Sequence, residues 1–384
     1  MKIIYFTTSL EADDYVKFNS YWKTSLNPSN QNFHNKIIRS LALTNTVEVI
    51  SVRPFSRRNC TVKKLVPQVK ETGNIIWNYL GIKNIPIIRT KYNKKQARKI
   101  LRGIDLNFAV IVTDTINPRV MNLAIKMGKE FNLPVIGLCT DSPSNISGTR
   151  KSYTLSVLNS GQKLDGYVSL TPSLNDLFNV NEKPSMILEG IVENDLPRTA
   201  KNEVGNYFFF GGALMKRYGI YELIEAFKAL NHQDIKLIIC GHHANEAALK
   251  DAIGTEENIV YLKTLPVTEV LKYEMNTIAN INPRPYSEDL DRFSIPSKTI
   301  EYLSSGRPTI SVRNTRLQKD FGENAIWSKS SNPEDLLTAM KCVLDLSEKE
   351  RIELGKKARE KTLALYSLSA VNKILSKFLD QFIK

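Results

Sequence analysis

The sequence lacks the features of a membrane-spanning or secreted protein. No apolar run reaches the roughly 18 residues that a membrane helix needs. The first residues, MKIIYFTT, look like a strand, and no apolar stretch ends at a small-residue cleavage site. Only four cysteines occur among 384 residues, at the isolated positions 60, 139, 240 and 342. Such cysteines favour free thiols over disulfides or zinc ligands, so we expect a cytoplasmic chain.

Signatures of several enzyme classes are absent as well. His242 and His243 are adjacent, so on a strand they would point to opposite faces, and no third ligand is placed beside them. No serine lies in a nucleophile-elbow pattern. No repeat of 20–50 residues is visible. We therefore expect no metal site, no serine nucleophile and no solenoid.

Acidic residues are scarce in one part of the chain. Residues 1–190 carry 26 Lys and Arg against 13 Asp and Glu, whereas residues 191–384 carry 27 against 26. Residues 51–100 hold 13 basic residues and a single acid, Glu71. The basic residues are Arg53, Arg57, Arg58, Lys63, Lys64, Lys70, Lys83, Arg89, Lys91, Lys94, Lys95, Arg98 and Lys99. A solvated helical face is one interpretation. An anionic membrane surface, at about 1 kcal/mol per basic residue, is the favoured one. No nucleic-acid motif accompanies the charge, so no nucleic acid is expected.

Apolar runs alternate with amphipathic runs along the chain, which predicts an α/β protein with parallel sheets. Strands are expected at Lys2–Thr8, Val47–Arg53, Ile85–Arg89, Phe108–Asp114, Pro134–Asp141, Gly166–Thr171, Met186–Glu189, Tyr207–Phe210, Lys236–Cys240, Ile259–Leu262, Ile278–Asn282 and Thr309–Val312. Helices are expected at Pro118–Phe131, at about 219–230, 244–252, 267–275, 297–304 and 333–345, and twice within 347–384. The polar, aperiodic stretch Gly190–Gly205 predicts a domain boundary.

The segment Asn282–Pro308 contains the strongest functional signal. A strand end is followed by a polar loop, by the helix-start residues Pro296 and Ser297, and by a helix stop at Gly306. A helix N-terminus at a strand end is an anion site, because unpaired backbone N–H groups converge there. Glu301 lies about one turn further on, where its carboxylate can accept hydrogen bonds from a sugar diol. The segment predicts a sugar-nucleotide site, and a surface carboxylate is the alternative for Glu301.

A second candidate element is the pair Gly211 and Gly212, between a very apolar strand and a helix. Two glycines let the backbone approach a ligand and let amide N–H groups face a phosphate, although paired glycines are also common in turns. Four basic residues add positive charge nearby: Lys216, Arg217, Arg284 and Lys298. Arg284 and Lys298 flank the predicted helix start, so they are the first candidates for holding a diphosphate.

In the first half, Asp114 and Asp141 each end a predicted strand. The carboxyl edge of a parallel sheet is where α/β proteins bind ligands, so both are candidate ligand-binding residues. For Asp141 the equal alternative is an Asx turn before Pro143. His34 is a further candidate, although a lone histidine is more often structural.

Three blocks of the second half resemble the retaining glycosyltransferases of family four, also called glycosyl transferases group 1. They are Tyr207–Phe227 (YFFFGGALMKRYGIYELIEAF), Ile235–Gly241 (IKLIICG) and Ile295–Ile310 (IPSKTIEYLSSGRPTI). The blocks occur in the family's order and spacing over residues 205–345. Over residues 1–200 the resemblance rests on pattern more than on motif.

The resemblance implies the GT-B fold, in which two Rossmann-like domains with parallel sheets face a central cleft. It implies an acceptor-binding domain at 1–190, a nucleotide-sugar-binding domain at 191–365, and a C-terminal helix at 366–384 that packs back on the first domain. It also implies a metal-independent enzyme without a cofactor. The enzyme would move a sugar from a nucleotide diphosphate, most simply UDP, to a glycan or lipid-linked acceptor with retention of configuration.

The resemblance also assigns roles to residues. Glu301 would bind the ribose hydroxyls, and Ser297 would lie at the phosphate end of the donor helix. Asp141 would lie near the reacting sugar, with His34 in the loop that meets the acceptor.

Three family positions differ: an Arg is replaced by Ala213, a Lys by Tyr218 and a second Glu by Phe293. The loop carboxylates Glu288, Asp289 and Asp291 are candidates to replace the missing Glu.

The resulting hypothesis is a transferase of cell-envelope polysaccharide or glycoconjugate synthesis, peripheral on the inner face of the cell membrane. Two rivals are kept. One is a sugar-nucleotide epimerase on the same fold, which would need acid and base carboxylates around the donor sugar. The other is a GT-B pseudoenzyme that serves as partner or chaperone of an active transferase, which the three differing positions favour.

Overall fold

The structure is a computed structural model that describes residues 1–384 except 24, 25, 27, 56–59, 63, 83–85, 147, 196–205, 243, 244 and 384. The described residues form two compact units. The first unit comprises Met1–Ile191, Arg292–Ile295 and Leu368–Lys384, and the second comprises Val192–Asp291 and Pro296–Ser367. Each is described separately below.

The first unit contains an eight-stranded sheet with the order β3-β4-β2-β1-β5-β6-β7-β8. Its strands are β1 (Lys2–Thr7), β2 (Thr46–Ser51), β3 (Gln68–Thr72), β4 (Ile75–Tyr79), β5 (Ala109–Asp114), β6 (Val135–Cys139), β7 (Gly166–Ser169) and β8 (Ser185–Ile187). Its helices are α1 (Ala12–Asn19), α2 (Pro28–Leu41), α3 (Pro86–Arg102), α4 (Pro118–Phe131), α5 (Lys151–Gly161), α6 (Pro172–Phe178) and α15 (Leu368–Asp380). Only the pairing of β3 with β4 is antiparallel among these neighbours. The carboxyl ends of the parallel strands therefore share one edge.

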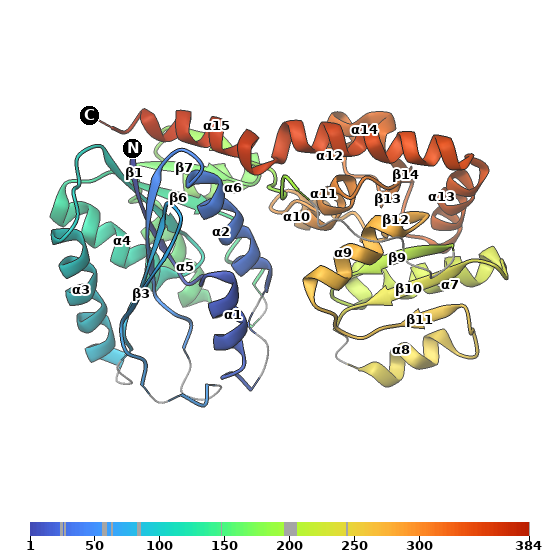
Figure 1. Ribbon diagram of the computed structural model, residues 1–384, viewed down its shortest axis with the longest axis horizontal. Helices are drawn as coiled ribbons and strands as arrows, with labels where there is room; N and C mark the ends of the chain where they lie inside the picture. Colours follow the sequence, from blue (N-terminus) through green and yellow to red (C-terminus); the bar gives the residue numbers. More distant parts are fainter. Residues whose placement is uncertain are drawn as a thin grey trace. The chain divides into compact units, whose positions relative to one another are not determined.

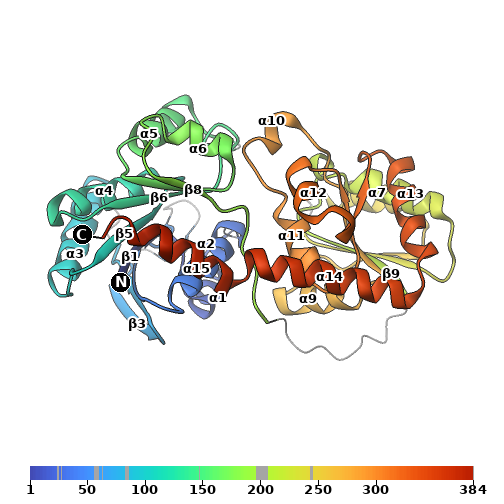
Figure 2. The ribbon, with the colours of Figure 1, turned by 90° about the horizontal axis from the view of Figure 1, so that it is seen from above.

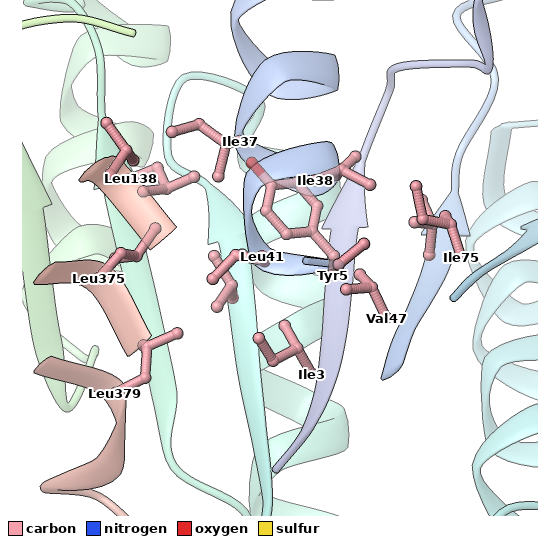
Figure 3. Packing of buried hydrophobic residues seen from close by; sticks show 14 of the residues in the cluster. Ile3, Tyr5, Ile37, Ile38, Leu41, Val47, Ile75, Leu138, Leu375 and Leu379 are labelled. Carbon is pink, nitrogen blue, oxygen red and sulfur yellow. The ribbon is translucent and has the colours of Figure 1, made fainter. Parts of the chain in front are cut away.

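Helices cover both faces of this sheet (Figure 1). Because successive strand residues point to opposite faces, Ile3 and Tyr5 of β1 pack with α2 and α15, while Ile4 and Phe6 pack with α3 and α4. Figure 3 shows the first of these cores, where α2 and α15 cover the strands with the side chains of Ile37, Ile38, Leu41, Leu375 and Leu379. The C-terminal helix is part of the first unit, and Ser40 Oγ donates a hydrogen bond to Leu368 O at 2.7 Å.

The second unit contains a parallel six-stranded sheet with the order β11-β10-β9-β12-β13-β14. Its strands are β9 (Tyr207–Gly211), β10 (Lys236–Cys240), β11 (Ile259–Tyr261), β12 (Ala279–Asn282), β13 (Thr309–Val312) and β14 (Ile326–Ser328). Its α-helices are α7 (Ile220–Leu230), α8 (Glu246–Ile253), α9 (Val267–Asn276), α10 (Glu288–Asp291), α11 (Ser297–Ser304), α12 (Thr315–Phe321), α13 (Pro333–Asp345) and α14 (Glu348–Tyr366), and its 3-10 helices are η1 (Lys216–Tyr218) and η2 (Gly322–Asn324).

The aromatic strand β9 separates the two cores of the second unit. Phe208 and Phe210 pack with α7 and α13 on one face, and Tyr207 and Phe209 pack with α9 on the other. Figure 2 shows α7 and α13 on one side of the sheet and α9 on the other. A strand that is apolar on both faces is typical of a buried central strand.

One expected strand is wrong. The described part of Ile85–Arg89 lies in α3, which begins at Pro86 and continues to Arg102. Proline is favoured at the first helical position because its fixed φ suits the helix and its missing N–H is not needed there. Strands β3, β4 and β14 were not predicted. Strand β3 is mostly exposed at the sheet edge, so it lacks the alternating pattern of a half-buried strand.

Candidate active site

Side chains tie α11 to the carboxyl ends of β9, β12 and β13, three neighbouring strands of the second sheet. The Tyr302 hydroxyl accepts a hydrogen bond from Gly211 N at 2.9 Å and donates one to Gly211 O at 3.1 Å. Asn282 Nδ2 donates to Thr299 Oγ1 at 2.8 Å, and Thr299 Oγ1 lies 2.9 Å from Ser311 Oγ. All five residues are buried. Buried polar groups that are hydrogen-bonded hold a defined geometry, so the helix is fixed on the sheet edge.

The N-terminus of α11 has no side-chain cap. Its N-cap residue is Pro296, which makes no side-chain capping hydrogen bond, and Ser297 is exposed. The first N–H groups of a helix have no partner within the helix, and the helix dipole adds partial positive charge there. The arrangement at Ser297 therefore has the anion-binding geometry that the sequence predicted for this segment.

Lys298 and Glu301 form an ion pair one turn apart on α11. Lys298 Nζ lies 2.8 Å from Glu301 Oε2 and 3.9 Å from Glu274 Oε1 of α9. Burial alone would lower the pKa of Lys298, but the carboxylates of Glu301 and Glu274 raise that pKa well above its ordinary value. The ammonium group therefore stays charged at neutral pH. The side chains of Lys298 and Glu301 are 36% and 34% exposed, so both are open to solvent.

The glycine loop, defined here as Gly211–Met215, does not use its first amides as predicted. Gly211 N–H donates to the Tyr302 hydroxyl, and Gly212 N–H donates to Cys240 O at 2.9 Å. The expectation that these two amides face a phosphate is therefore wrong. The glycines instead leave room, since a Cβ on Gly212 would lie 3.9 Å from Lys298 Cε. A ligand can approach the backbone where a side chain would otherwise stand.

Two further glycines permit close backbone contacts around the loop. A Cβ on Gly241, whose φ is +141°, would lie 1.6 Å from Gly212 O. A Cβ on Gly219, whose φ is +77°, would lie 2.2 Å from Pro283 O at the end of β12. Both distances are far below any real contact. Only glycine at position 241 therefore allows the backbone after β10 to approach Gly212 so closely. Only glycine at position 219 allows the backbone before α7 to approach Pro283 so closely.

The other predicted donor residues lie on two segments, one directly after the glycine loop and one after β12. Lys216 and Arg217 are exposed on η1, and the Arg217 guanidinium lies 4.9 Å from the ring centroid of Tyr218. Arg284, after β12, pairs with Asp291 Oδ1 at 3.2 Å, and Asp291 Oδ2 accepts a hydrogen bond from Ser287 N. Asp291 is therefore directed to Arg284. The other two loop carboxylates, Glu288 and Asp289, are exposed.

Phe293 belongs to the packing of the first unit. The segment Arg292–Ile295 is part of that unit, and Phe293 packs against the core formed by α3, α4, α5 and α6. Thr171 Oγ1 donates a hydrogen bond to Arg292 O at 2.7 Å. The position at which the resemblance places a second glutamate is therefore occupied by an apolar packing residue.

At the carboxyl edge of the first sheet, His34 joins Tyr5 and Asp114. His34 Nδ1 lies 2.6 Å from the Tyr5 hydroxyl, and His34 Nε2 lies 3.7 Å from Asp114 Oδ2. Burial, and then Asp114, raise the pKa of Tyr5, so its hydroxyl stays protonated and donates to Nδ1. Burial lowers the pKa of His34, although Asp114 opposes this shift. The neutral imidazole then carries its proton on Nε2, facing Asp114. The side chains of His34 and Asp114 are 0% and 2% exposed.

Asp141 is more open than Asp114. It is half-buried, and its Oδ1 accepts a hydrogen bond from Ser142 N at 2.8 Å. Tyr153 lies in the electrostatic field of both carboxylates: burial raises its pKa to about 12, and Asp114 and Asp141 act in the same direction. The structure thus brings the two predicted aspartates to one edge, with Tyr153 beside them. The sequence analysis did not identify Tyr153.

The comparisons with known proteins concern the family and the fold. Residues 192–361 match the family model described as Glycosyl transferases group 1. This segment is similar to glycosyl transferases, and the chain has an α/β fold of the GT-B type.

Solved structures resemble the chain over almost its whole length. Sucrose-phosphate synthase from Thermosynechococcus elongatus aligns with a TM-score of 0.69 at 11% identity, covering 99% of both chains. The trehalose 6-phosphate synthase of Burkholderia multivorans aligns at 0.67 and 9% identity, covering 99% of this chain and 98% of the other. Anabaena HepE in complex with UDP aligns at 0.67 and 12% identity, covering 99% and 100%. At such identities the likeness establishes the fold alone. No curated protein matches the sequence.

The basic stretch of residues 51–100 is only partly on the surface. Arg53 is 4% exposed, and its guanidinium donates to Leu80 O at 3.0 Å. On α3, Lys94 and Arg98 both pair with Glu130 of α4. Four basic residues of α3 are exposed: Lys91, Lys95, Lys99 and Arg102. Their spacing of four, four and three residues places them on one side of the helix, and we call them the α3 stripe. Arg57, Arg58, Lys63 and Lys83 lie outside the described residues.

The described residues contain neither a metal-binding cluster nor a membrane-spanning helix. No group of three or more His, Cys, Asp or Glu in the described part of the chain is arranged to hold a metal ion. His243 lies outside that part, so the geometry of the adjacent histidines is not described. Across the same residues, no helix combines the length and the apolar character needed to cross a membrane.

Tyr302, Thr299 and Glu274 are the site residues that the sequence analysis missed in the second unit. Tyr302 and Thr299 lie inside the quoted block Ile295–Ile310, one position either side of the pair Ile300 and Glu301, so their place beside the donor residues was visible in the sequence. Glu274 carried no signal, because it lies 24 residues before Lys298 on another helix and is 2% exposed.

Proposed function

We propose that the protein is a glycosyltransferase that binds a nucleotide diphosphate sugar, with UDP as the nucleotide, at α11 of the second unit. The observation that carries this proposal is the pairing of Lys298 with Glu301 beside an uncapped helix N-terminus. One short helix thus presents a cation and N–H groups for phosphate and a carboxylate for hydroxyl groups. Diphosphate and ribose are joined in a nucleotide sugar, so one ligand satisfies both.

Donor binding would rearrange the ion pair. The diphosphate would replace Glu301 as the partner of Lys298, which frees the Glu301 carboxylate to accept hydrogen bonds from the ribose hydroxyls. Lys298 keeps its charge through this exchange, because Glu274 lies 3.9 Å from the ammonium group and supports its raised pKa. Arg284 would supply a second cation, and its present partner Asp291 holds it after β12.

The proposed reaction is sugar transfer with retention and without a metal ion. As the bond to the sugar breaks, negative charge develops on the leaving diphosphate, and preorganised cations and N–H groups stabilise it. The acceptor hydroxyl would attack from the face that the diphosphate leaves, and the leaving phosphate oxygen would take its proton. No protein base is then required. In the first unit, Asp141 is our candidate for the contact with the reacting sugar. Of the two predicted aspartates at the carboxyl edge of the first sheet, it is the one that is not fully buried.

We further propose that the acceptor is a glycan or a lipid-linked sugar of cell-envelope polysaccharide or glycoconjugate synthesis. The α3 stripe supports a lipid-linked acceptor, since four exposed basic residues on one helix side suit an anionic membrane surface. The UDP assignment is supported by the fold shared with HepE, whose structure contains UDP.

A panel of UDP-sugars tests the proposed function. The protein is incubated with each UDP-sugar, with and without lipid-linked acceptors, and UDP release is measured in the presence and absence of a chelator. We expect acceptor-dependent UDP release that survives the chelator, and a product whose anomeric configuration, read by NMR, equals that of the donor. Inverted configuration contradicts retention, and loss of activity with chelator contradicts metal independence.

The same assay separates the two rival functions. Conversion of one UDP-sugar into another without UDP release would identify an epimerase. UDP binding without turnover across the acceptor panel would identify a partner protein. We expect neither outcome, because Lys298 and Glu301 suit the leaving group and the ribose. An epimerase needs further carboxylates around the sugar. The family's second glutamate is replaced here by Phe293, which packs in the first unit.

A further inference from the structure

We propose that Tyr302 is a positioning residue, whose hydroxyl holds the glycine loop against the donor helix and thereby sets the affinity for the nucleotide. This inference rests on the proposed function. It concerns a residue that need not touch the donor, because its hydroxyl is already used inside the protein. Tyr302 is fully buried at 0% exposure.

The hydroxyl of Tyr302 forms hydrogen bonds to strand β9 beyond the point where the pairing of β9 with β12 ends. Strand β12 pairs with β9 through Ala279–Phe208 and Asn280–Phe209, and the described ladder between these two strands ends there. Gly211, two residues further along β9, presents its N–H and C=O on the same side as Phe209, since alternate residues of a strand pair in the same direction. The phenol bonds both groups, at 2.9 and 3.1 Å, in the place of a neighbouring strand.

The phenol can serve both groups because it stays protonated. Burial, the largest cause, raises the pKa of Tyr302 well above its ordinary value, and Glu274 adds to the shift against the opposing effect of Lys298. A neutral hydroxyl accepts one hydrogen bond while donating another. Phenylalanine would fill the same volume and would leave Gly211 N–H and C=O buried without this partner, which is unfavourable for buried polar groups.

The bond matters for the donor because α11 carries both proposed donor contacts. Lys298 lies four residues before Tyr302 and therefore on the same side of the helix, and its ammonium group lies 5.8 Å from the Tyr302 ring centroid. A Cβ added to the next residue of the loop, Gly212, would lie 3.9 Å from Lys298 Cε. The phenol thus fixes the distance between the loop backbone and the charged pair. Without it the loop is free to move away from Lys298 and Glu301, and a ligand that contacts both sides binds less tightly.

Tyr302→Phe tests the proposal, with Tyr207→Phe as the matched control. Tyr207 lies on β9, the strand that contains Gly211, and is also 0% exposed. Its hydroxyl donates a hydrogen bond to a backbone carbonyl, Tyr273 O, at 2.9 Å. Both variants lose a buried phenol hydrogen bond, so both should melt at lower temperature than the wild type. In calorimetric titration with UDP we expect Tyr302→Phe to bind roughly tenfold more weakly, and Tyr207→Phe to bind like the wild type. In turnover, Tyr302→Phe should raise the KM for the donor and leave the KM for the acceptor unchanged.

The outcomes separate this inference from the proposed function. If the wild type binds neither UDP nor another nucleoside diphosphate, the proposed function fails. If the wild type binds UDP and Tyr302→Phe binds equally well, the function stands and the positioning role is overturned. Equal losses of affinity in both tyrosine variants would show a general effect of stability and would also overturn it.

A measurement on the wild type covers the case in which Tyr302→Phe does not fold. Hydrogen–deuterium exchange is followed for the glycine loop and for α11 with and without UDP. If the phenol couples the two, the segments gain protection together when UDP binds. Protection gained by α11 while exchange in the loop is unchanged would overturn the proposal.

Discussion

The carboxyl edges of the two sheets use their polar residues differently. In the first unit, His34 and Asp114 are 0% and 2% exposed and face each other, so their interactions stay inside the protein. In the second unit, Lys298 and Glu301 are 36% and 34% exposed at the same kind of edge. An ion pair open to solvent can exchange its partner for a ligand at low cost, whereas a buried pair must first be broken. The second edge is thus ready for a charged ligand, and in the first edge Asp141 is the accessible carboxylate.

The units also differ in charge. Residues 1–190 carry 26 basic against 13 acidic residues, whereas residues 191–384 carry 27 against 26. The charges of the second half nearly balance, whereas the first half has twice as many basic as acidic residues. The difference suggests that the second unit recognises a small anion and the first rests on an extended one. The following predictions test that contrast, from the largest expected effect to the smallest.

The α3 stripe should give the largest effect. Replacing Lys91, Lys95, Lys99 and Arg102 together by glutamine should remove about 4 kcal/mol of attraction to anionic vesicles, at about 1 kcal/mol per residue. Vesicle co-sedimentation measures it, and binding should fall steeply with salt because the Debye length is only about 10 Å at 0.1 M.

The control for the stripe is the double change of Lys94 and Arg98 to glutamine. Both residues pair with Glu130, so their removal should weaken membrane binding less than an equal number of stripe changes. Equal binding to neutral and anionic vesicles, or no binding to either, would make the stripe a solvated face and favour soluble acceptors.

Gly241→Ala should destabilise the second unit by about 3 kcal/mol, the upper range for a strained backbone position, since its Cβ would lie 1.6 Å from Gly212 O. Denaturant unfolding measures the change. Gly73→Ala in the first unit is the control: its φ is also positive, at +59°, but no atom lies within 4 Å of the added Cβ. The control should cost only about 1 kcal/mol. Equal costs would show that backbone angle, not close approach to the loop, explains Gly241.

Glu301→Ala should weaken UDP binding by about 2 kcal/mol, because the ribose hydroxyls lose a charged acceptor. Calorimetric titration measures the affinity. Glu256→Ala, an exposed change elsewhere in the second unit, should leave it unaltered. A Glu301→Ala affinity equal to that of the wild type would remove Glu301 from the donor site.

Lys298→Ala and Arg284→Ala should each lower kcat about tenfold, or about 1.4 kcal/mol in the barrier, because the leaving diphosphate loses a cation. The loss of folding stability, measured by thermal melting, should be smaller than the increase in the reaction barrier. Lys319→Ala, an exposed change on α12, is the control. Wild-type turnover in both variants would place the phosphate contact elsewhere, with Lys216 and Arg217 as the next candidates.

His34 should give the smallest effect, a loss of about 1 kcal/mol or less in the free energy of unfolding as the pH falls below about 6.5. Burial lowers the pKa of His34 in the folded state, so the unfolded chain binds a proton at a higher pH than the folded one. Stability is therefore complete above the unfolded pKa and declines as the pH falls toward the folded pKa. Denaturant unfolding at several pH values should show a flatter dependence for His34→Gln. An unchanged slope would contradict the assignment.

Local sequence was a good guide where an element carries its own signals. The expected strands Lys236–Cys240 and Thr309–Val312 have the observed bounds, and the helix expected at about 297–304 is α11. Each is a short apolar run or an amphipathic run bounded by glycine or proline. A short, mostly apolar run such as Ile85–Arg89 shows no clear period, and a strand was expected in what is helix α3.

By itself, the sequence determined helix α11 and the charge contrast. Pro296, Glu301 and Gly306 lie close together in the chain, so their spacing on a helix follows from backbone geometry alone. Tertiary structure decided which distant groups meet. Tyr302 bonds Gly211 across 91 residues, and His34 meets Asp114 across 80. Such pairs depend on the order of strands in a sheet and on where each ladder ends. Those features arise only when the strands pack, so no local pattern encodes them, and the use of the Gly211 and Gly212 amides was predicted wrongly for that reason.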